Sequence, residues 1–534
     1  MLSEILMTIK GLAVIALAVY GFAALLRKED AEWVKRGPLT IFLSIFFIGM
    51  WGQNVWVVYA ALLLIIPLLA KSRSDAAALY VVALVSCPLL KEKIAFGSIY
   101  LMPLSKYVFV SLGLGITFLI KRRAEPAFRR SHFDIPILII AILELAQARS
   151  DSPTVVLRQT VIVLIAVLLP YFAISRSLTN PAEVRRFCLA FALAGFVMAA
   201  VATIEVRLHW LIYKHIEAVL DIAKHLNPYL KLRGGTVRAP ASFPESTALA
   251  LFLAMATVML FAVRSNFASA GKLCIALAVM ALGLLSANSR GAFVALAIGL
   301  PLLDLYRRRY SELFVKVAAG AGLFLIVVAA AQFSTFFASV LGKGTGEAGS
   351  ADYRWLLWHR GLEEIAKHPF FGTSLQTAMD HLEDLRQGED IIDLVNGYIN
   401  YGLTAGYPGM VALLLVFVSL SIAMLAMRRG IGSSQFIGDA AGAVFGISTF
   451  SILSTFYGGF GGESTPFYMI CALGSAAWAL RRSAATDQYG AGTVAVRTTT
   501  PTRALIEADR AAAQTRSFRL RRLDAVEPPA VSAN

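Results

Sequence analysis

Three arginines lie beside long apolar runs, where a charged side chain is costly to place. Arg158 lies in "VVLRQTVIVL", Arg238 in "VRAPASFPESTALALF", and Arg290 in "SANSRGAF", a short interruption between two uncharged runs. A guanidinium can hold phosphate-type oxygens with two parallel N–H bonds. The residue type and the positions therefore predict an anion clamp. Taken singly, each arginine is also compatible with an interfacial residue that reaches toward lipid headgroups.

Other titratable residues near the same segments have simpler interpretations. Glu363 and Glu364 are spaced to pair with Lys367 and Arg360 at i,i+4, which predicts a solvated helix face. Glu245 follows a proline and predicts a negative charge at a helix start, or a member of the site. The histidines match no metal-ligand spacing, and the four cysteines lie inside apolar runs. We therefore expect no metal, no cofactor and no disulfide.

The elements that must position these residues are membrane helices. The chain has 534 residues, of which 57% are hydrophobic and only 16% are charged, whereas soluble domains average about 45–50% and about 25%. The net charge of +15 comes mainly from short basic clusters between apolar runs. That distribution is typical of cytoplasmic loops of membrane proteins and argues against nucleic-acid binding.

The apolar runs predict an all-α polytopic membrane protein with about 14 transmembrane helices. The candidate spans are 5–26, 38–52, 54–70, 76–90, 107–120, 135–148, 155–174, 187–206, 244–264, 272–287, 291–305, 313–333, 406–427, 436–456 and 464–480.

Basic clusters orient these spans. The clusters at 27–36, 71–73, 121–130, 185–186, 307–309 and 428–429 can all be cytoplasmic if the first span enters from outside. The two longest interruptions, 207–243 and 334–405, then both lie on the periplasmic side.

Apolar spacing over 207–226 predicts an amphipathic surface helix. Residues 481–534 form a basic segment without an apolar run, which predicts a mostly disordered cytoplasmic tail. We expect residues 1–480 to be one transmembrane domain, and its first apolar run to be a membrane span and not a cleavable signal peptide.

Four segments, in order, resemble the O-antigen ligase and polymerase-like family. They are "RAPASFPESTALALFLA", "SANSRGAFVALAIGL", "DYRWLLWHRGLEEIAKHPFFGTS" (352–374) and "LVNGYINYGLTAGYPGM" (394–410). Together they cover roughly residues 235–430.

The resemblance implies a GT-C-like helical bundle with a large periplasmic helical loop, in the bacterial inner membrane. It also implies that Arg238 and Arg290 contact the diphosphate of an undecaprenyl-diphosphate-linked glycan at the periplasmic face. The loop supplies substrate-binding candidates, and Arg158 is a further candidate for the clamp. Those loop candidates are Arg354, Trp358, Asn396 and Tyr398. The loop aromatics are equally compatible with stacking on sugar rings and with packing of the loop helix.

The sequence departs from the family pattern at two positions. Val395 replaces the histidine of the ligases, and Thr404 replaces the usual glutamate. An attacking glycan hydroxyl must lose its proton, and Asp393 is the nearest replacement carboxylate, although it could equally cap a helix. The sequence resembles related capsule and exopolysaccharide polymerases in lacking this histidine, so the resemblance favours a polysaccharide polymerase that acts in exopolysaccharide, capsule or O-antigen biosynthesis. Because arginines would neutralise the leaving diphosphate, we expect it to be metal-independent.

Three alternatives stay open. A ligase would move the glycan onto the lipid A-core of lipopolysaccharide or onto another acceptor. A flippase or transporter of the lipid-linked unit would need ionisable residues deep inside its helices. A non-enzymatic scaffold would assemble with other envelope polysaccharide export proteins.

Overall fold

The computed structural model describes residues 2–96, 99–121, 131–148, 152–221, 232–233, 236–341, 348–386, 392–428, 435–457 and 465–497. The chain divides into two units, Met1–Leu480 and Arg481–Asn534. The first unit contains the helical bundle and all the candidate site residues. The predicted tail falls in the second: residues 481–497 are helical as part of α20 (Thr465–Arg497), and 498–534 lie outside the described residues.

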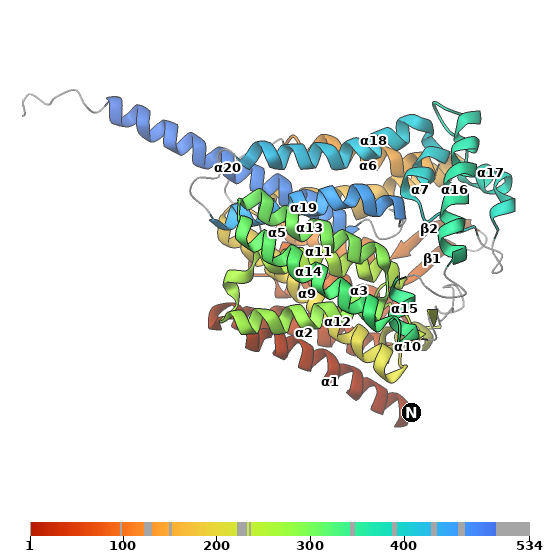
Figure 1. Ribbon diagram of the computed structural model, residues 1–534, viewed down its shortest axis with the longest axis horizontal. Helices are drawn as coiled ribbons and strands as arrows, with labels where there is room; N and C mark the ends of the chain where they lie inside the picture. Colours follow the sequence, from red (N-terminus) through yellow and green to blue (C-terminus); the bar gives the residue numbers. More distant parts are fainter. Residues whose placement is uncertain are drawn as a thin grey trace, which may run out of the picture. The chain divides into compact units, whose positions relative to one another are not determined.

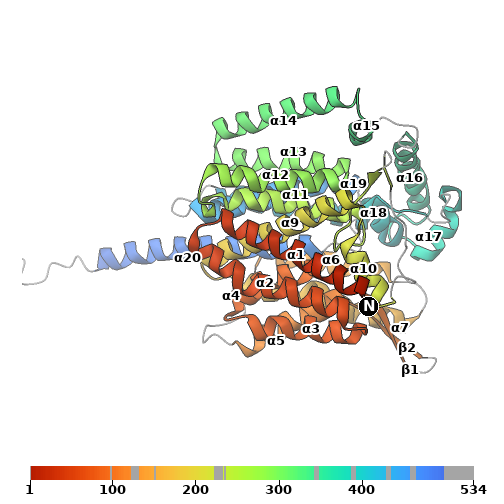
Figure 2. The same ribbon diagram turned by 90° about the horizontal axis from the view of Figure 1, so that it is seen from below.

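Each predicted apolar segment overlaps a helix (Figures 1 and 2). In the amino-terminal half these are α1 (Leu2–Leu25), α2 (Lys28–Trp51), α3 (Val55–Leu69), α4 (Arg73–Val85), α5 (Lys106–Ile120), α6 (Asp134–Gln147), α7 (Pro153–Val163), η1 (Leu164–Leu168), α8 (Leu169–Ser177) and α9 (Pro181–Leu208). Later in the chain come α11 (Ser246–Ala262), η2 (Arg264–Asn266), α12 (Ala270–Ala287), α13 (Arg290–Arg307), α14 (Tyr310–Ala330), α18 (Gly397–Met427), α19 (Gln435–Tyr457) and α20.

Among the described residues, eight helices are long and apolar enough to cross a membrane by length and composition, and α3, α5 and α11 are shorter apolar helices. A bilayer core of about 30 Å needs about 20 helical residues. The prediction of a polytopic helical membrane protein is thereby supported, whereas the count of about 14 spans stays a prediction.

The bundle is organised around α9. This helix packs against α1, α4, α11 and α12, and most of its side chains are buried. Helices α13, α18 and α19 form an adjoining layer, with α19 between the other two. Phe191 on α9 packs on Phe252 of α11, with ring centroids 4.9 Å apart. The core therefore joins helices that are distant in the sequence.

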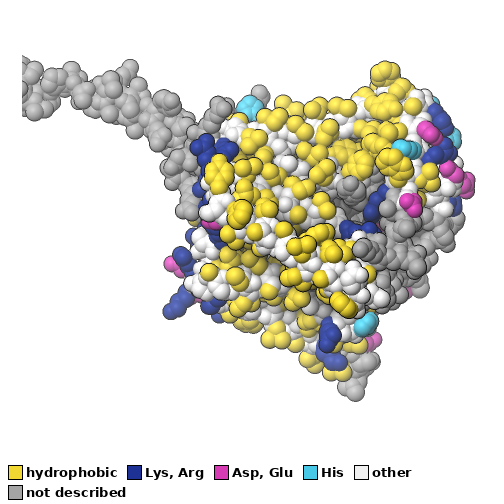
Figure 3. All heavy atoms as spheres, in the orientation of Figure 1, with side chains coloured by type: hydrophobic (Ala, Val, Ile, Leu, Met, Phe, Trp, Pro, Cys, Tyr) yellow, Lys and Arg dark blue, Asp and Glu magenta, His cyan; other side chains and the backbone are white. Residues whose placement is uncertain are grey.

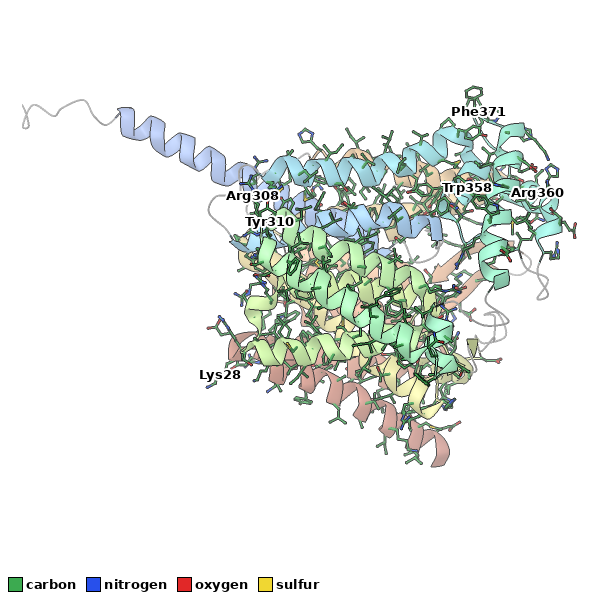
Figure 4. All side chains as sticks on the ribbon, in the orientation of Figure 1. Lys28, Arg308, Tyr310, Trp358, Arg360 and Phe371 are labelled. Carbon is green, nitrogen blue, oxygen red and sulfur yellow. The ribbon has the colours of Figure 1, made fainter. Side chains whose placement is uncertain are left out.

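The two ends of the bundle differ in chemistry. Lys28 and Arg308 lie at one end, and Trp358, Arg360 and Phe371 lie at the other (Figure 4). Hydrophobic side chains cover the surface between these ends (Figure 3). The end that carries Arg308 is tied by ion pairs between helix termini: Arg176–Asp134, Arg264–Glu312, Arg307–Asp439 and Arg309–Asp439. Lys28 and Arg308, which belong to two of the basic clusters, therefore lie at the end opposite Trp358 and Arg360, and which membrane face each end meets stays a prediction.

Helix α14 differs from the other long helices because none of its 21 residues is buried. It packs on α13 and α15, and it stands out from the other helices in Figure 2. Two ion pairs, Arg264–Glu312 and Lys316–Asp304, connect the first two turns of α14 to the neighbouring residues.

The segment 334–405 is mainly helical. It contains α15 (Thr335–Leu341), α16 (Ala348–Lys367), α17 (Leu375–His381) and η3 (Glu383–Leu385). Leu357, Ile365, Leu382 and Leu385 form a small separate core with Leu403 of α18. The segment is therefore a packed unit seated on α18.

Three local features differ from the sequence expectations. The hairpin β1 (Lys91–Phe96) to β2 (Ile99–Ser105) and the pair β3 (Leu232–Arg233) and β4 (Thr236–Val237) are short antiparallel sheets in a chain expected to be all helical. The predicted surface helix over 207–226 is not continuous in the part that the structure describes: α9 ends at Leu208, and α10 (Ile212–Val219) follows after His209, whose φ is 51°, while 222–226 lie outside the described residues. α10 packs against α2.

Candidate functional site

Arg290 is the first residue of α13, directly after the tight turn from α12. Asn288 makes this turn in the left-handed conformation, with φ 44° and ψ 58°, and its N–H donates to the carbonyls of Leu284 and Leu285. Asparagine tolerates this conformation better than most residues because its short polar side chain relieves the steric conflict. The sequence "SANSR" therefore reverses the chain within two residues and presents a half-buried Arg290 at a helix start.

Arg238 lies against the same turn. The segment after β4 runs beside the end of α12, where Ala239 N donates to Ser286 O at 3.1 Å and Arg238 Nε donates to Ala287 O at 3.3 Å. Ala287 is three positions before Arg290, and both arginines are half-buried. The Arg238 side chain is thus bonded to the helix–helix junction from which Arg290 begins α13. This arrangement can hold an anion with two charges.

Two buried charged residues hold the segment that carries Arg238, and sequence reasoning missed both. Glu205, near the end of α9, accepts from Ala241 N at 3.0 Å and from Ile212 N at 2.9 Å. Lys106, the first residue of α5, donates to Ser242 O at 3.3 Å and to Cys87 O at 2.8 Å. Lys106 could have been noticed because it is an isolated cation outside every basic cluster, at a span end predicted to face outward.

Arg158 lies on α7, which packs against α6 and β2. The side chain is half-buried. Helix α6 in turn packs on α18. Membership of Arg158 in the anion clamp stays a prediction.

The loop candidates Arg354 and Trp358 lie on α16, and both are half-buried. The ring of Trp358 packs on Phe456 of α19, with centroids 4.7 Å apart. Trp355 on the same helix is 66% exposed and lies beside His359, with ring centroids 4.4 Å apart. Of these two tryptophans, Trp358 has the geometry of a residue that seats the loop on the bundle, and Trp355 is the one available for stacking.

Asn396 and Tyr398 begin α18. Asn396 is 3% exposed and caps the helix, because its Oδ1 accepts from Tyr398 N at 3.0 Å and from Ile399 N at 3.2 Å. The hydroxyl of Tyr398 donates to Ile452 O of α19 at 2.9 Å. Both side chains, expected to contact substrate, make structural contacts, and a substrate contact by either stays a prediction.

Asp393 precedes this helix and is exposed. Its backbone carbonyl accepts from the hydroxyl of Tyr353 at 3.1 Å, which ties the approach to α18 onto α16. A different carboxylate lies among the helices at the same end: Glu144 of α6 accepts from Tyr401 at 2.7 Å and from Tyr468 at 3.3 Å. Sequence reasoning passed over Glu144 because it is one acidic residue inside an apolar run.

The two loop motifs interlock at two glycines. Gly406 interrupts α18 with φ 70° and ψ −168°, and a Cβ there would lie 2.4 Å from Pro369 O. Gly372 has φ 60°, and a Cβ there would lie 2.5 Å from Leu403 O. Tyr407 N donates to Pro369 O at 2.8 Å across the same contact. The turn after α16 and the kink in α18 therefore form one unit that admits only glycine at both positions.

The acidic pair on α16 is arranged differently from the prediction. Glu363 pairs with Arg360, and Glu364 with Lys367, both at i,i+3 rather than i,i+4. Glu364 is 3% exposed, so its face is not solvated, and His381 Nδ1 lies 2.6 Å from its Oε1. Burial raises the pKa of Glu364, but hydrogen bonds from Lys367 and His381 outweigh it, and the net pKa is lowered. This carboxylate therefore joins α16 to α17.

The fold and the apolar helices define a multi-pass helical membrane protein. Residues 275–414 match the family model described as O-antigen ligase, which supports an O-antigen ligase/polymerase-like family for this chain. The matched segment contains Arg290 and the loop candidates, whereas Arg158 and Arg238 precede it. A search of curated proteins found no match. The family similarity supports a function of the ligase/polymerase type and a glycosyltransferase-like enzyme in general terms.

Proposed function

We propose that the protein is a polysaccharide polymerase. It transfers glycan from an undecaprenyl-diphosphate carrier to another lipid-linked repeat unit at the periplasmic face of the inner membrane. The observation that carries this proposal is that hydrogen bonds from Arg238 Nε to Ala287 O and from Ala239 N to Ser286 O hold the Arg238 segment against the turn from which Arg290 begins α13. A diphosphate leaving group gains negative charge as it departs, and two guanidiniums at a helix start stabilise that charge.

In the proposed reaction the acceptor hydroxyl attacks the anomeric carbon of the donor sugar. The bond from that carbon to the diphosphate oxygen breaks, and the diphosphate leaves with the electron pair. The hydroxyl proton passes to a carboxylate, for which Asp393 is the proposed base and Glu144 the competing candidate. Arg354 is proposed to contact the acceptor, and Trp358 to position it indirectly by holding α16 on α19. In many enzymes that release phosphate a metal ion stabilises the negative charge of the leaving group. Here the arginines would stabilise that charge, so we expect the reaction to be metal-independent.

A ligase remains the second candidate, because the matched family model is described as O-antigen ligase. Purified protein supplied only with lipid-linked repeat units distinguishes the two. A ladder of longer glycans supports the polymerase. Product that forms only after a separate acceptor is added supports the ligase, and lipid movement without new glycosidic bonds supports a flippase.

The arginine pair has its own test in the same assay. Arg290→Ala and Arg238→Ala should each lower the rate about 100- to 1,000-fold, the usual effect of removing one transition-state donor. Asp439→Asn is a matched control, since it alters a 5% exposed carboxylate in the network with Arg307 and Arg309 at the other end. Full activity with alanine at both 238 and 290 would exclude the arginine clamp.

A further inference from the structure

Glu205 is a carboxylate with 0% exposure, and the proposed reaction does not use it. A buried carboxylate is unfavourable unless hydrogen bonds and charges compensate for the lost water. Glu205 receives two backbone hydrogen bonds, from Ala241 to Oε2 and from Ile212 to Oε1. Ala241 lies in the irregular segment before α11, and Ile212 is the first residue of α10, so the carboxylate joins the end of α9 to two separate segments.

The bond to Ala241 falls on a strained residue. Ala241 has φ 47°, a left-handed conformation that a residue with a Cβ adopts only when its surroundings impose it. The next residue, Ser242, is 0% exposed, and its carbonyl accepts from the buried ammonium of Lys106. The strained turn is therefore held on one side by a carboxylate and on the other by a cation.

This turn sets the position of Arg238. Only two residues, Ala239 and Pro240, separate Arg238 from Ala241, and Ala239 N is bonded to Ser286 O. Proline restricts its own backbone and that of the residue before it. Because this connection is short and stiff, the position of Arg238 depends directly on the position of Ala241. The placement of Arg238 at the junction that also carries Arg290 therefore depends on this turn.

We propose that Glu205 is a positioning residue for the arginine pair. Its carboxylate holds Ala241 in the left-handed conformation and so fixes the guanidinium of Arg238 at the α12–α13 turn, with Lys106 supporting the same segment. Glu205 acts through Arg238 and touches no substrate. The inference rests on the proposed function, because it assigns to this carboxylate the alignment of the diphosphate site.

The test is a double-mutant cycle on product formation from lipid-linked repeat units. Glu205→Gln cannot accept from both backbone N–H groups with its amide, so we expect kcat/KM to fall on the order of 10- to 100-fold. Since Glu205 acts through Arg238, the double variant with Arg238→Ala should be no slower than Arg238→Ala alone. Glu32→Gln, which changes an exposed carboxylate paired with Arg36 on α2, should keep wild-type activity.

A rescue variant separates positioning from general stability. Glycine adopts φ 47° without a Cβ penalty, so Ala241→Gly should recover most of the activity of Glu205→Gln, and Ala241→Gly alone should be close to wild type. If Glu205→Gln does not accumulate in membranes, the combined variant should restore both abundance and activity.

Effects of Glu205→Gln and Arg238→Ala that simply multiply, no rescue by Ala241→Gly, or full activity of Glu205→Gln would each overturn the inference. Absence of glycan product with the wild-type protein would instead contradict the proposed function, and wild-type activity of Arg238→Ala would contradict the arginine clamp on which the inference rests. The two failures are therefore distinguishable.

Discussion

Replacing Gly406 with alanine tests the interlock between the loop and α18. The residue occupies a backbone region that is essentially restricted to glycine, with φ 70° and ψ −168°. Holding an alanine there costs about 1–3 kcal/mol. Its Cβ would also lie 2.4 Å from Pro369 O, which accepts from Tyr407 N. Displacing that carbonyl removes a hydrogen bond with a net contribution of about 0.5–1.5 kcal/mol.

Together these effects destabilise the interlock by about 2–4 kcal/mol, so its open form should be about 30- to 700-fold more populated. Leu403 is 1% exposed beside the contact. The labelling rate of Leu403→Cys by a water-soluble maleimide therefore reports this opening. The background is Cys274→Ser, because Cys274 is the exposed cysteine.

Gly320 provides the matched control. It lies in α14, and a Cβ there would meet nothing within 4 Å. Gly320→Ala should leave the labelling rate at position 403 unchanged. Equal labelling in Gly406→Ala and Gly320→Ala would refute the interlock as the element that holds the loop on the bundle.

Further predictions address single groups. Arg158→Ala should lower the rate at least 10-fold if this arginine joins the anion clamp, and wild-type kinetics would remove it from the site. Asp393→Asn should lower the rate about 100- to 10,000-fold if Asp393 is the base, whereas loss in Glu144→Gln alone would transfer the role to Glu144. EDTA should leave product formation unchanged, and a loss reversed by Mg²⁺ would contradict metal independence. Because the pKa of Glu364 is lowered in the folded loop, its stabilisation is present above the ordinary carboxyl pKa and is lost as the pH falls through the lowered value. Proteolysis of the loop should therefore accelerate in acid, and Glu364→Gln should be cleaved faster at neutral pH and lose most of this acid dependence.

The helices were predictable because each depends on a local property, a run of apolar residues long enough to form it. The residues at which the helices begin and end were harder to predict. The span predicted over 406–427 corresponds to α18, which begins nine residues earlier, at Gly397. Gly406 and Pro408 are residues that usually end a helix. Here the contact with Pro369 stabilises a kink, and the helix continues across it.

The arginine pair was predictable in part. Arg238 and Arg290 could be singled out by residue type and by the motifs around them. Their shared junction could not be predicted, because it depends on hydrogen bonds between residues 47 and 49 positions apart. The roles of Glu205 and Lys106 could not be predicted, because each depends on a distant hydrogen-bond partner. Ala241 lies 36 positions after Glu205, and Ser242 lies 136 positions after Lys106. Pairing of that kind is a property of the packed bundle and leaves no local pattern in the sequence.

The exposure of α14 has a practical consequence for sample preparation. A straight helix of 21 residues is about 32 Å long, which is close to the thickness of a bilayer's hydrocarbon core. Glu312 and Lys316 hold the start of the helix, and none of its side chains is buried although it packs on α13 and α15, so we expect its tilt to respond to bilayer thickness. Spin labels on this helix should therefore give different distances in thin and thick nanodiscs, while labels on α9 should not. Conformational measurements on this protein belong in bilayers of defined thickness, not in detergent micelles.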